Sequence, residues 1–213
     1  MKIALVIGGT GLVGKQLTNL LINDKRYSKV VLLVRKPLGI IHEKLEQIQF
    51  DYDNPDETLI KGDDFFCCLG TTKAKAGSKE AFYKIDHDYV LNTATTAFKN
   101  GIKRAAIVSS IGANKNSSVF YQKTKGEVEE GASKIGFEAC YILRPSVLVG
   151  NRTELRLGES LGIFFLNIFS FAMPKKYKPV AGNKVAQAMI NAINSGKTGV
   201  QVIESDVINA TAV

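Results

Sequence analysis

The chain has few residues of the kinds that bind metals or form disulfide bonds. Among its 213 residues are two histidines, His42 and His87, and three cysteines, Cys67, Cys68 and Cys140. The histidines lie far apart and have no partner at ligand spacing, and the cysteine spacing matches neither a metal site nor a disulfide framework. We therefore expect no metal site and free, buried thiols, as in a reducing cytosol.

Long hydrophobic runs are also missing. The most apolar stretch, residues 161–173 (LGIFFLNIFSFAM), is too short to span a bilayer, and three lysines follow it. A buried helix or a lid over an active site accounts for this pattern better than membrane-surface docking, and the stretch could also serve a dimer contact. No charged-then-apolar segment opens the chain, so we expect a cytoplasmic protein rather than an exported one.

The charge pattern does not indicate a nucleic-acid partner. The formal net charge is +8, but the lysines and arginines are scattered, and no nucleic-acid-binding motif accompanies them. Internal repeats and linkers of low complexity are absent too. The length then favours a single domain, residues 1–213, in which residues 151–180 form a small substrate or lid appendage.

A glycine-rich turn near the start of the chain is its most informative feature. The segment KIALVIGGTGLVG joins an apolar strand to a helix with apolar positions at helical spacing. Gly8 can adopt angles closed to other residues, Gly11 admits a pyrophosphate, and Gly14 allows close packing of the helix on the strand. A P-loop is excluded because no GK[ST] follows. The expected dinucleotide contacts here are Gly8, Gly9, Thr10, Gly11, Leu12, Val13 and Gly14.

Strand and helix patterns alternate along the rest of the chain. This alternation predicts a doubly wound, parallel Rossmann sheet with helices on both faces, an α/β fold with a small C-terminal appendage. The cofactor should cross the sheet edge where the strand order reverses, beside Leu69, Gly70 and Thr71. Strands are predicted at 29–34, 46–50, 63–69, 105–109, 138–143 and 199–203, and helices at 83–100, 126–135 and 184–194.

The end of the second strand indicates which cofactor is bound. An NAD-specific site places an acid there for the ribose 2′-hydroxyl, whereas an NADP site places a cation for the 2′-phosphate. Here the strand ends in Arg35 and Lys36. We therefore predict NADP(H), with NAD(H) as the less favoured alternative. Asp51 either accepts a hydrogen bond from the adenine amino group or caps a turn.

A Ser-Tyr-Lys set follows the fifth predicted strand. Tyr121 and Lys125 are four residues apart, so on a helix they share one face. A neighbouring ammonium favours the phenolate and tunes a phenol for proton transfer near neutral pH. Ser110 would hold the substrate oxygen beside Tyr121, with Ser109 as the competitor for that role. Asp86 and Asp88 flank His87 near a helix start, and we interpret both acids as favouring the helix dipole.

These motifs resemble a known family. GGTGLVG, the RK pair, FCCLGTTKAKAG, IDHDYVLN, SSIGANKNSSVFYQKTKGEVE and RPSVLVGNRTELRLGE are similar to the Tat-interactive-protein oxidoreductases, an atypical or extended branch of the short-chain dehydrogenases/reductases. The resemblance covers nearly the whole chain. It implies NADP(H) bound by the residues named above, including Tyr121 and Lys125, with Leu148 by the nicotinamide and Arg156 reaching the cofactor or substrate.

Three functions are compatible with these predicted residues. The first is an NADP(H)-dependent oxidoreductase that transfers hydride to or from a small carbonyl or alcohol. The second is an NADP(H)-sensing binding protein without turnover, although such proteins often lose the tyrosine that this chain keeps. The third, a sugar-nucleotide epimerase or dehydratase, uses the same residues but needs a larger substrate region than follows Gly150.

Overall fold

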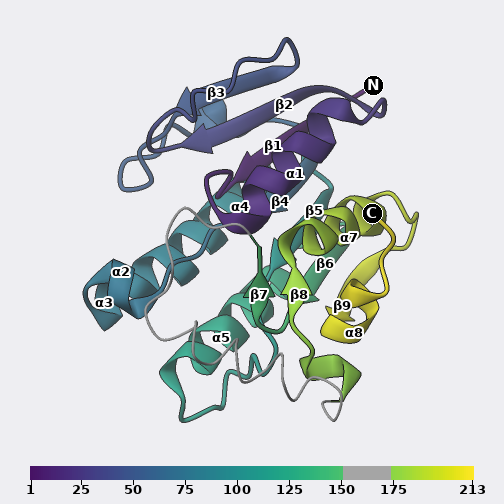
Figure 1. Cartoon of the computed structure of the whole chain (residues 1–213). Helices are drawn as coiled ribbons and strands as arrows, with labels where there is room; N and C mark the ends of the chain where they lie inside the picture. Colours follow the sequence, from purple (N-terminus) through teal and green to yellow (C-terminus); the bar gives the residue numbers. More distant parts are fainter. Residues whose placement is uncertain (151–173) are drawn as a thin grey trace.

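The computed structural model describes residues 1–150 and 174–213. Seven parallel strands form one sheet in the order β3-β2-β1-β4-β5-β6-β9, which confirms the predicted Rossmann architecture (Figure 1). The strands are β1 (Lys2–Ile7), β2 (Tyr27–Val34), β3 (Leu45–Gln49), β4 (Asp64–Cys67), β5 (Arg104–Val108), β6 (Ala139–Arg144) and β9 (Gly199–Glu204).

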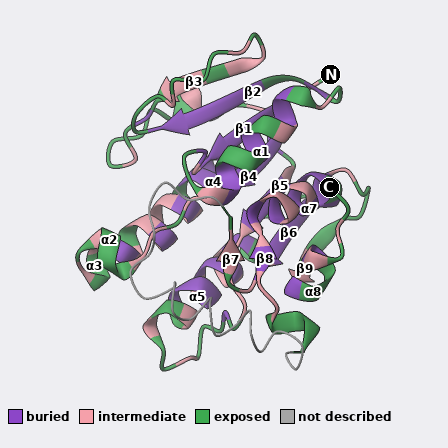
Figure 2. Ribbon diagram, in the orientation of Figure 1, coloured by how far each residue is buried: buried purple, intermediate pink, exposed green. Residues whose placement is uncertain are grey.

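Helices cover both faces of this sheet. On one face, α1 (Leu12–Asn23), α7 (Gly182–Ile193) and the short α8 (Ser205–Asn209) contribute to one apolar cluster. On the other face, α4 (Tyr89–Lys99) and α5 (Phe120–Lys134) contribute to a second cluster. Figure 2 shows the central strands almost entirely buried between these layers.

Apolar periodicity explains why the helices pack where they do. Leu17 and Leu21 are one turn apart on α1, and both are fully buried against the sheet. Burying each such side chain contributes about 1.5–3 kcal/mol. The adjacent cysteines illustrate the alternation of a strand, since Cys67 joins the α4–α5 cluster and Cys68 packs against the α1–α7 cluster. All three cysteines are free, as predicted; Cys67 and Cys140 are buried, whereas Cys68 is partly exposed.

The strand order reverses between β1 and β4. From β1 the chain passes through α1 to β2 and β3 on one side, whereas β4 pairs with the other side of β1. At the carboxyl edge Ile7 lies opposite Cys67. The glycine turn after β1 and the loop after β4 therefore meet at this edge, as the sequence predicts.

Two predicted helices differ from the structure at their starts. The helix predicted from Tyr83 is preceded by α3 (Lys79–Tyr83) and joined to α4 through a π-helical turn, η2 (Lys84–Asp88). Helix α5 begins at Phe120 rather than Gly126. The remaining short elements of the described residues are η1 (Glu57–Leu59), α2 (Lys73–Ala76), β7 (Leu148–Val149), η3 (Lys175–Tyr177) and β8 (Val180–Ala181).

The predicted appendage, residues 151–180, lies mostly outside the described residues, and so does Arg156. Its described end carries η3 and β8, and β8 pairs in parallel with β7. Beyond it, α7 and β9 complete the main layers, in agreement with the helix and strand predicted there. Across the described part of the chain, no helix has the length and apolarity needed to cross a membrane.

Candidate cofactor and active site

The glycine turn brings the start of α1 against the end of β4. Gly8 has a φ of +75°, and a Cβ on it would lie 2.3 Å from the backbone nitrogen of Leu69. A Cβ on Gly14 would lie 2.2 Å from the Gly8 carbonyl oxygen. At Gly11, by contrast, the nearest atom to a Cβ is the Gly8 oxygen at 3.4 Å, so this position is far less crowded. In the part of the chain that the structure describes, no side chain caps α1, whose first N–H groups suit an anionic phosphate.

Two cations stand at the carboxyl end of β2. Arg35 and Lys36 are exposed, and within the described residues neither forms an ion pair with an acid. An unpaired guanidinium can bind a phosphate through two N–H groups. The position and chemistry of these side chains therefore suit a ribose 2′-phosphate.

Asp51 follows β3 and is engaged in its own loop. Its Oδ1 accepts a hydrogen bond from the Asp53 backbone N–H at 2.9 Å, and its Oδ2 accepts one from Asn54 Nδ2 at 3.3 Å. The loop bonds lower the pKa of Asp51 from its ordinary value. Of the two roles that the sequence leaves open, the structure supplies the turn-capping one.

Lys125 lies buried beneath the loop that follows β4. Its Nζ is 2.7 Å from Oδ1 of Asp86, and the two side chains are only 7% and 1% exposed. The other oxygen of Asp86 accepts the Thr71 N–H at 2.7 Å. A Cβ on Gly70 would lie 3.2 Å from Asp86 Oδ1 and 3.6 Å from Lys125 Nζ. The predicted cofactor-lining loop and the predicted catalytic lysine are thus brought together by an acid.

That placement corrects our interpretation of Asp86. It does not cap a helix start; it lies inside the continuous helical segment from α3 to α4, on the buried face. Burial of the ammonium is the largest single influence and lowers the pKa of Lys125, but Asp86, Tyr121 and Cys67 together raise it, so the resulting pKa lies above the ordinary value. Lys125 therefore stays charged despite its burial.

Tyr121 stands one helical turn before Lys125 on α5. Its side chain is 42% exposed, and its ring packs against Phe82 with centroids 5.9 Å apart. Because the hydroxyl makes no hydrogen bond to any other described residue, it can meet a substrate oxygen. The electrostatic interaction with Tyr121 is one of the influences that raise the pKa of Lys125.

The two serines after β5 have different partners. Ser109 is buried, and its Oγ donates to Oε1 of Glu129 at 2.5 Å. Ser110 is half-buried, and the one hydrogen bond of its hydroxyl to a described residue is a 3.3 Å bond to the carbonyl oxygen of Ile111. The Ser109 hydroxyl is occupied by its hydrogen bond to Glu129 in the protein interior, whereas the Ser110 hydroxyl is available for a ligand.

Glu129 links three strand ends below this site. Besides Ser109, its carboxylate binds Arg144 Nε at 2.9 Å and Nη2 at 2.6 Å. Arg144, at the end of β6, also reaches Glu204 at the end of β9, at 3.0 Å. We refer to Ser109, Glu129, Arg144 and Glu204 as the strand-end network. The bonds to Glu129 raise the pKa of Arg144 above its ordinary value, although burial acts in the opposite direction.

Asp86 was assigned the wrong role from the sequence and Glu129 was not identified, although a signal for each was present. Phe82, Asp86 and Val90 recur at four-residue spacing, which places the aspartate on an apolar helical stripe. Glu129 follows Lys125 at the same spacing, next to the buried Val128. A carboxylate on the buried face of a helix requires a charged or hydrogen-bonding partner, so its position in the sequence indicates a buried polar contact.

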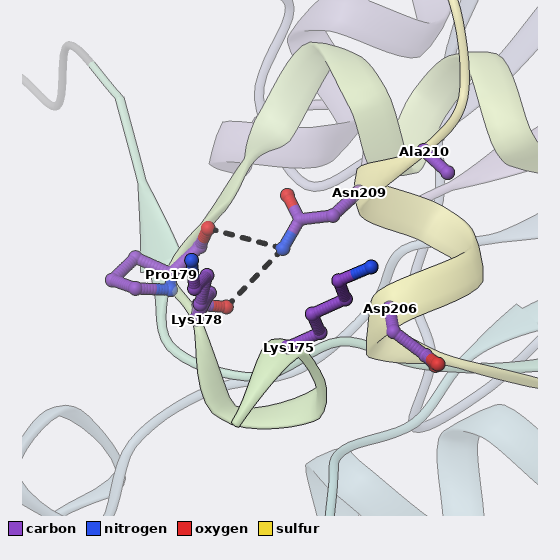
Figure 3. Close-up of a pocket in the computed structure, with 6 residues that line it drawn as sticks. All are labelled: Lys175, Lys178, Pro179, Asp206, Asn209 and Ala210. Carbon is purple, nitrogen blue, oxygen red and sulfur yellow. Dashed lines mark hydrogen bonds between the residues drawn. The ribbon is translucent and has the colours of Figure 1, made fainter. Parts of the chain in front are cut away.

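Among the described residues, two cavities bear on the location of the site. One, of about 190 Å³, is lined by Leu12 and Gln16 of α1 and by Val149, Gly150, Ala181, Gly182 and Asn183. It adjoins the uncapped start of α1, and Leu148, the residue implied to lie by the nicotinamide, is half-buried next to it on β7. The other, of about 400 Å³, is shown in Figure 3 and is lined by Lys175, Lys178, Pro179, Asp206, Asn209 and Ala210.

The cavity in Figure 3 contains none of the predicted site residues. Asn209 Nδ2 donates to the carbonyl oxygens of Lys178 and Pro179, at 3.3 Å each. These bonds tie α8 to the segment before β8. We therefore assign the cavity a structural origin and place the candidate site at the carboxyl ends of β1, β4 and β5.

Comparison with known proteins agrees with this geometry. Residues 8–148 match the model of a family described as NAD(P)H-binding. Rat protein HTATIP2 is 32% identical over an alignment 213 residues long, and the match covers 97% of this chain and 88% of that protein. Protein FMP52, mitochondrial, from Eremothecium gossypii is 35% identical over 210 residues, or 95% and 93% of the two chains.

Solved structures share the fold at low sequence identity. MoeE5 in complex with UDP-glucose and NAD has a TM-score of 0.72 at 15% identity, over 96% of this chain and 79% of that one. UDP-glucose 4-epimerase from Thermotoga maritima has a TM-score of 0.70 at 17% identity, over 95% and 76%. From the family match and from relatives similar along nearly its whole length, the chain belongs to the NAD(P)H-binding, atypical branch of the short-chain dehydrogenases/reductases.

Proposed function

We propose that the protein is an NADP(H)-dependent oxidoreductase that interconverts a small carbonyl compound and its alcohol. The observation that carries the proposal is the buried, charged Lys125 one helical turn from the accessible hydroxyl of Tyr121. A lysine is retained at such burial when its charge has a use or a partner, and here a carboxylate provides the partner. The half-buried Ser110 belongs to the same sheet edge.

The residues present fit a dinucleotide. The open surroundings of Gly11 and the uncapped start of α1 suit the pyrophosphate, and Arg35 and Lys36 suit a 2′-phosphate. When bound, the nicotinamide supplies or accepts the hydride. This fit favours NADP(H) over NAD(H), because no acid stands at the end of β2 to accept from a ribose 2′-hydroxyl.

Each protein residue then has a defined task. Tyr121 donates a proton to the carbonyl oxygen in the reductive direction and accepts it back in the oxidative direction. Lys125 stabilises the phenolate form of Tyr121 by its positive charge. Ser110 donates a hydrogen bond to the same substrate oxygen and orients it towards Tyr121.

Nucleotide titration tests the cofactor assignment. We expect NADPH to bind more tightly than NADH, as measured by cofactor fluorescence. Replacing Arg35 with alanine should weaken NADPH binding by about 10- to 100-fold, because a hydrogen bond between charged groups contributes about 1.5–3 kcal/mol. NADH binding should be unchanged.

The matched control is Arg26→Ala, since Arg26 precedes β2 at the opposite edge of the sheet and pairs with Asp24. Equal weakening of NADPH and NADH by Arg35→Ala would contradict the 2′-phosphate assignment. A screen of carbonyl substrates with NADPH, with Tyr121→Phe as the blank, tests turnover. Equal rates for the wild type and Tyr121→Phe would refute the role of Tyr121.

A further inference from the structure

The acid that pairs with Lys125 occupies an unusual position in the backbone. Asp86 lies within the π-helical turn η2, between two α-helical segments. Such turns are rare, and they occur frequently at functional sites. This turn places the Asp86 carboxylate in the interior, where one oxygen contacts Lys125 at 2.7 Å and the other accepts the Thr71 N–H.

The carboxylate joins two parts of the site that are distant in sequence. Thr71 and Gly70 belong to the loop after β4, where the cofactor should cross the sheet, and Lys125 belongs to α5. The close approach of Gly70 to both charged groups shows that the loop backbone covers the pair. A shift of Asp86 would therefore disturb the loop and the lysine together.

We propose that Asp86 is a positioning residue, which keeps the Lys125 ammonium charged and fixed beneath the Gly70–Thr71 loop so that a bound nucleotide meets it as a cation. This inference rests on the proposed function, because it assumes that Lys125 contacts the nucleotide. Asp86 itself need not touch the substrate or the cofactor.

The charges around Lys125 make the effect of Asp86 specific. The groups that act on the ammonium are Asp86 from η2, Tyr121 from its own helix and Cys67 from β4. Cys67 carries no charge near neutral pH, since burial raises the pKa of its thiol to about 12. The next acid along α5, Glu129, is already paired with Arg144. Asp86 is thus the carboxylate that offsets the burial of Lys125.

Substitution of Asp86 by asparagine keeps the shape and removes the charge. Burial of Lys125 would then lower its pKa with no carboxylate to oppose it, and the lysine would lose its proton as the pH rises through that lowered value. Both proteins are titrated with NADPH at about pH 7 and at about pH 9.5. We expect the loss of affinity between these two pH values to be at least about 10-fold greater for Asp86→Asn than for the wild type.

Three further variants isolate this effect. Asp88→Asn is the matched control, because Asp88 ends the same turn but is 45% exposed and pairs with His87; it should follow the wild type at every pH. Lys125→Met should bind weakly and without additional pH dependence. Adding Asp86→Asn to Lys125→Met should cause no further loss of affinity. A pH profile of Asp86→Asn that matches that of Asp88→Asn would overturn the inference.

Thermal unfolding without nucleotide tests the pair even if binding fails. Lys125→Met leaves a buried carboxylate without its partner, so the double variant with Asp86→Asn should melt at a higher temperature than Lys125→Met alone. An equal or lower melting temperature would overturn the pairing. A wild type that folds but binds no NADPH would refute the proposed function, and the melting comparison would still decide the role of Asp86.

Discussion

Replacement of Glu129 by alanine should destabilise the fold through the strand-end network. The substitution removes both contacts to Arg144 and leaves the buried Ser109 hydroxyl without its acceptor. An unpaired buried hydroxyl costs about 1–3 kcal/mol, and a hydrogen bond to a charged group contributes about 1.5–3 kcal/mol. Because Arg144 is 26% exposed and keeps Glu204, solvent offsets part of the loss.

We therefore expect Glu129→Ala to lower the free energy of unfolding by roughly 3 kcal/mol. For a chain of this size, the corresponding decrease in melting temperature is about 6–12 °C. Urea unfolding followed by far-ultraviolet circular dichroism, with linear extrapolation, gives the free energy directly. Glu129→Gln should fall between the wild type and alanine, since its amide oxygen still accepts one bond while its amide nitrogen faces a donor.

Glu138→Ala provides the matched control. Glu138 is 60% exposed and pairs with Lys103 at the surface, so its loss should change the free energy of unfolding by about 0–1 kcal/mol. If Glu129→Ala were no more destabilising than Glu138→Ala, the network would contribute nothing beyond surface pairing. The reasoning that assigns Ser109 to the interior and leaves Ser110 for the ligand would then lose its energetic basis.

Two other predictions concern buried groups. Burial raises the pKa of the Cys67 and Cys140 thiols to about 12. In the native protein at about pH 8 both should therefore react negligibly with a thiol reagent, and both should react fully after unfolding. Rapid labelling of either thiol in the native state would contradict this prediction. Asp64 is fully buried and binds Arg104 Nε at 2.6 Å. Asp64→Ala should therefore lower the free energy of unfolding, measured in urea, by roughly 3 kcal/mol. A decrease below about 1 kcal/mol would show that this buried pair does not stabilise the fold.

The sheet and the glycine turn could be predicted from the sequence because both depend on local patterns. Apolar runs fix the strands, and the positive φ of Gly8 and the close approach of Gly14 to it follow from a strand, glycines and a helix in succession. The fold then determines which loops meet at the sheet edge. Their four-residue spacing predicted that Tyr121 and Lys125 would share one face of a helix, but the helix predicted from Gly126 excluded both, whereas α5 begins at Phe120.

The partners of buried charges could not be predicted in the same way. The Asp86–Lys125 contact joins residues 39 positions apart, and no periodicity encodes which cation an acid on a helix will meet. The π-helical turn adds to the difficulty, because it shifts the helical register by one residue at the point where Asp86 turns inwards. Helical spacing could still have placed Asp86 on the buried face, and the need for a partner would have followed.

The arrangement of α5 separates chemistry from stability along one helical stripe. Tyr121 faces the surface, Lys125 is buried against Asp86, and Glu129 binds the ends of the neighbouring strands. Each lies one turn beyond the last, so the helix that presents the phenol is anchored two turns further on. Substitutions at Asp86 should consequently change nucleotide binding with a distinct pH dependence, whereas substitutions at Glu129 should change mainly the free energy of unfolding. Loss of nucleotide affinity in Glu129→Ala beyond its unfolded fraction would mean that the anchor also sets the position of the lysine.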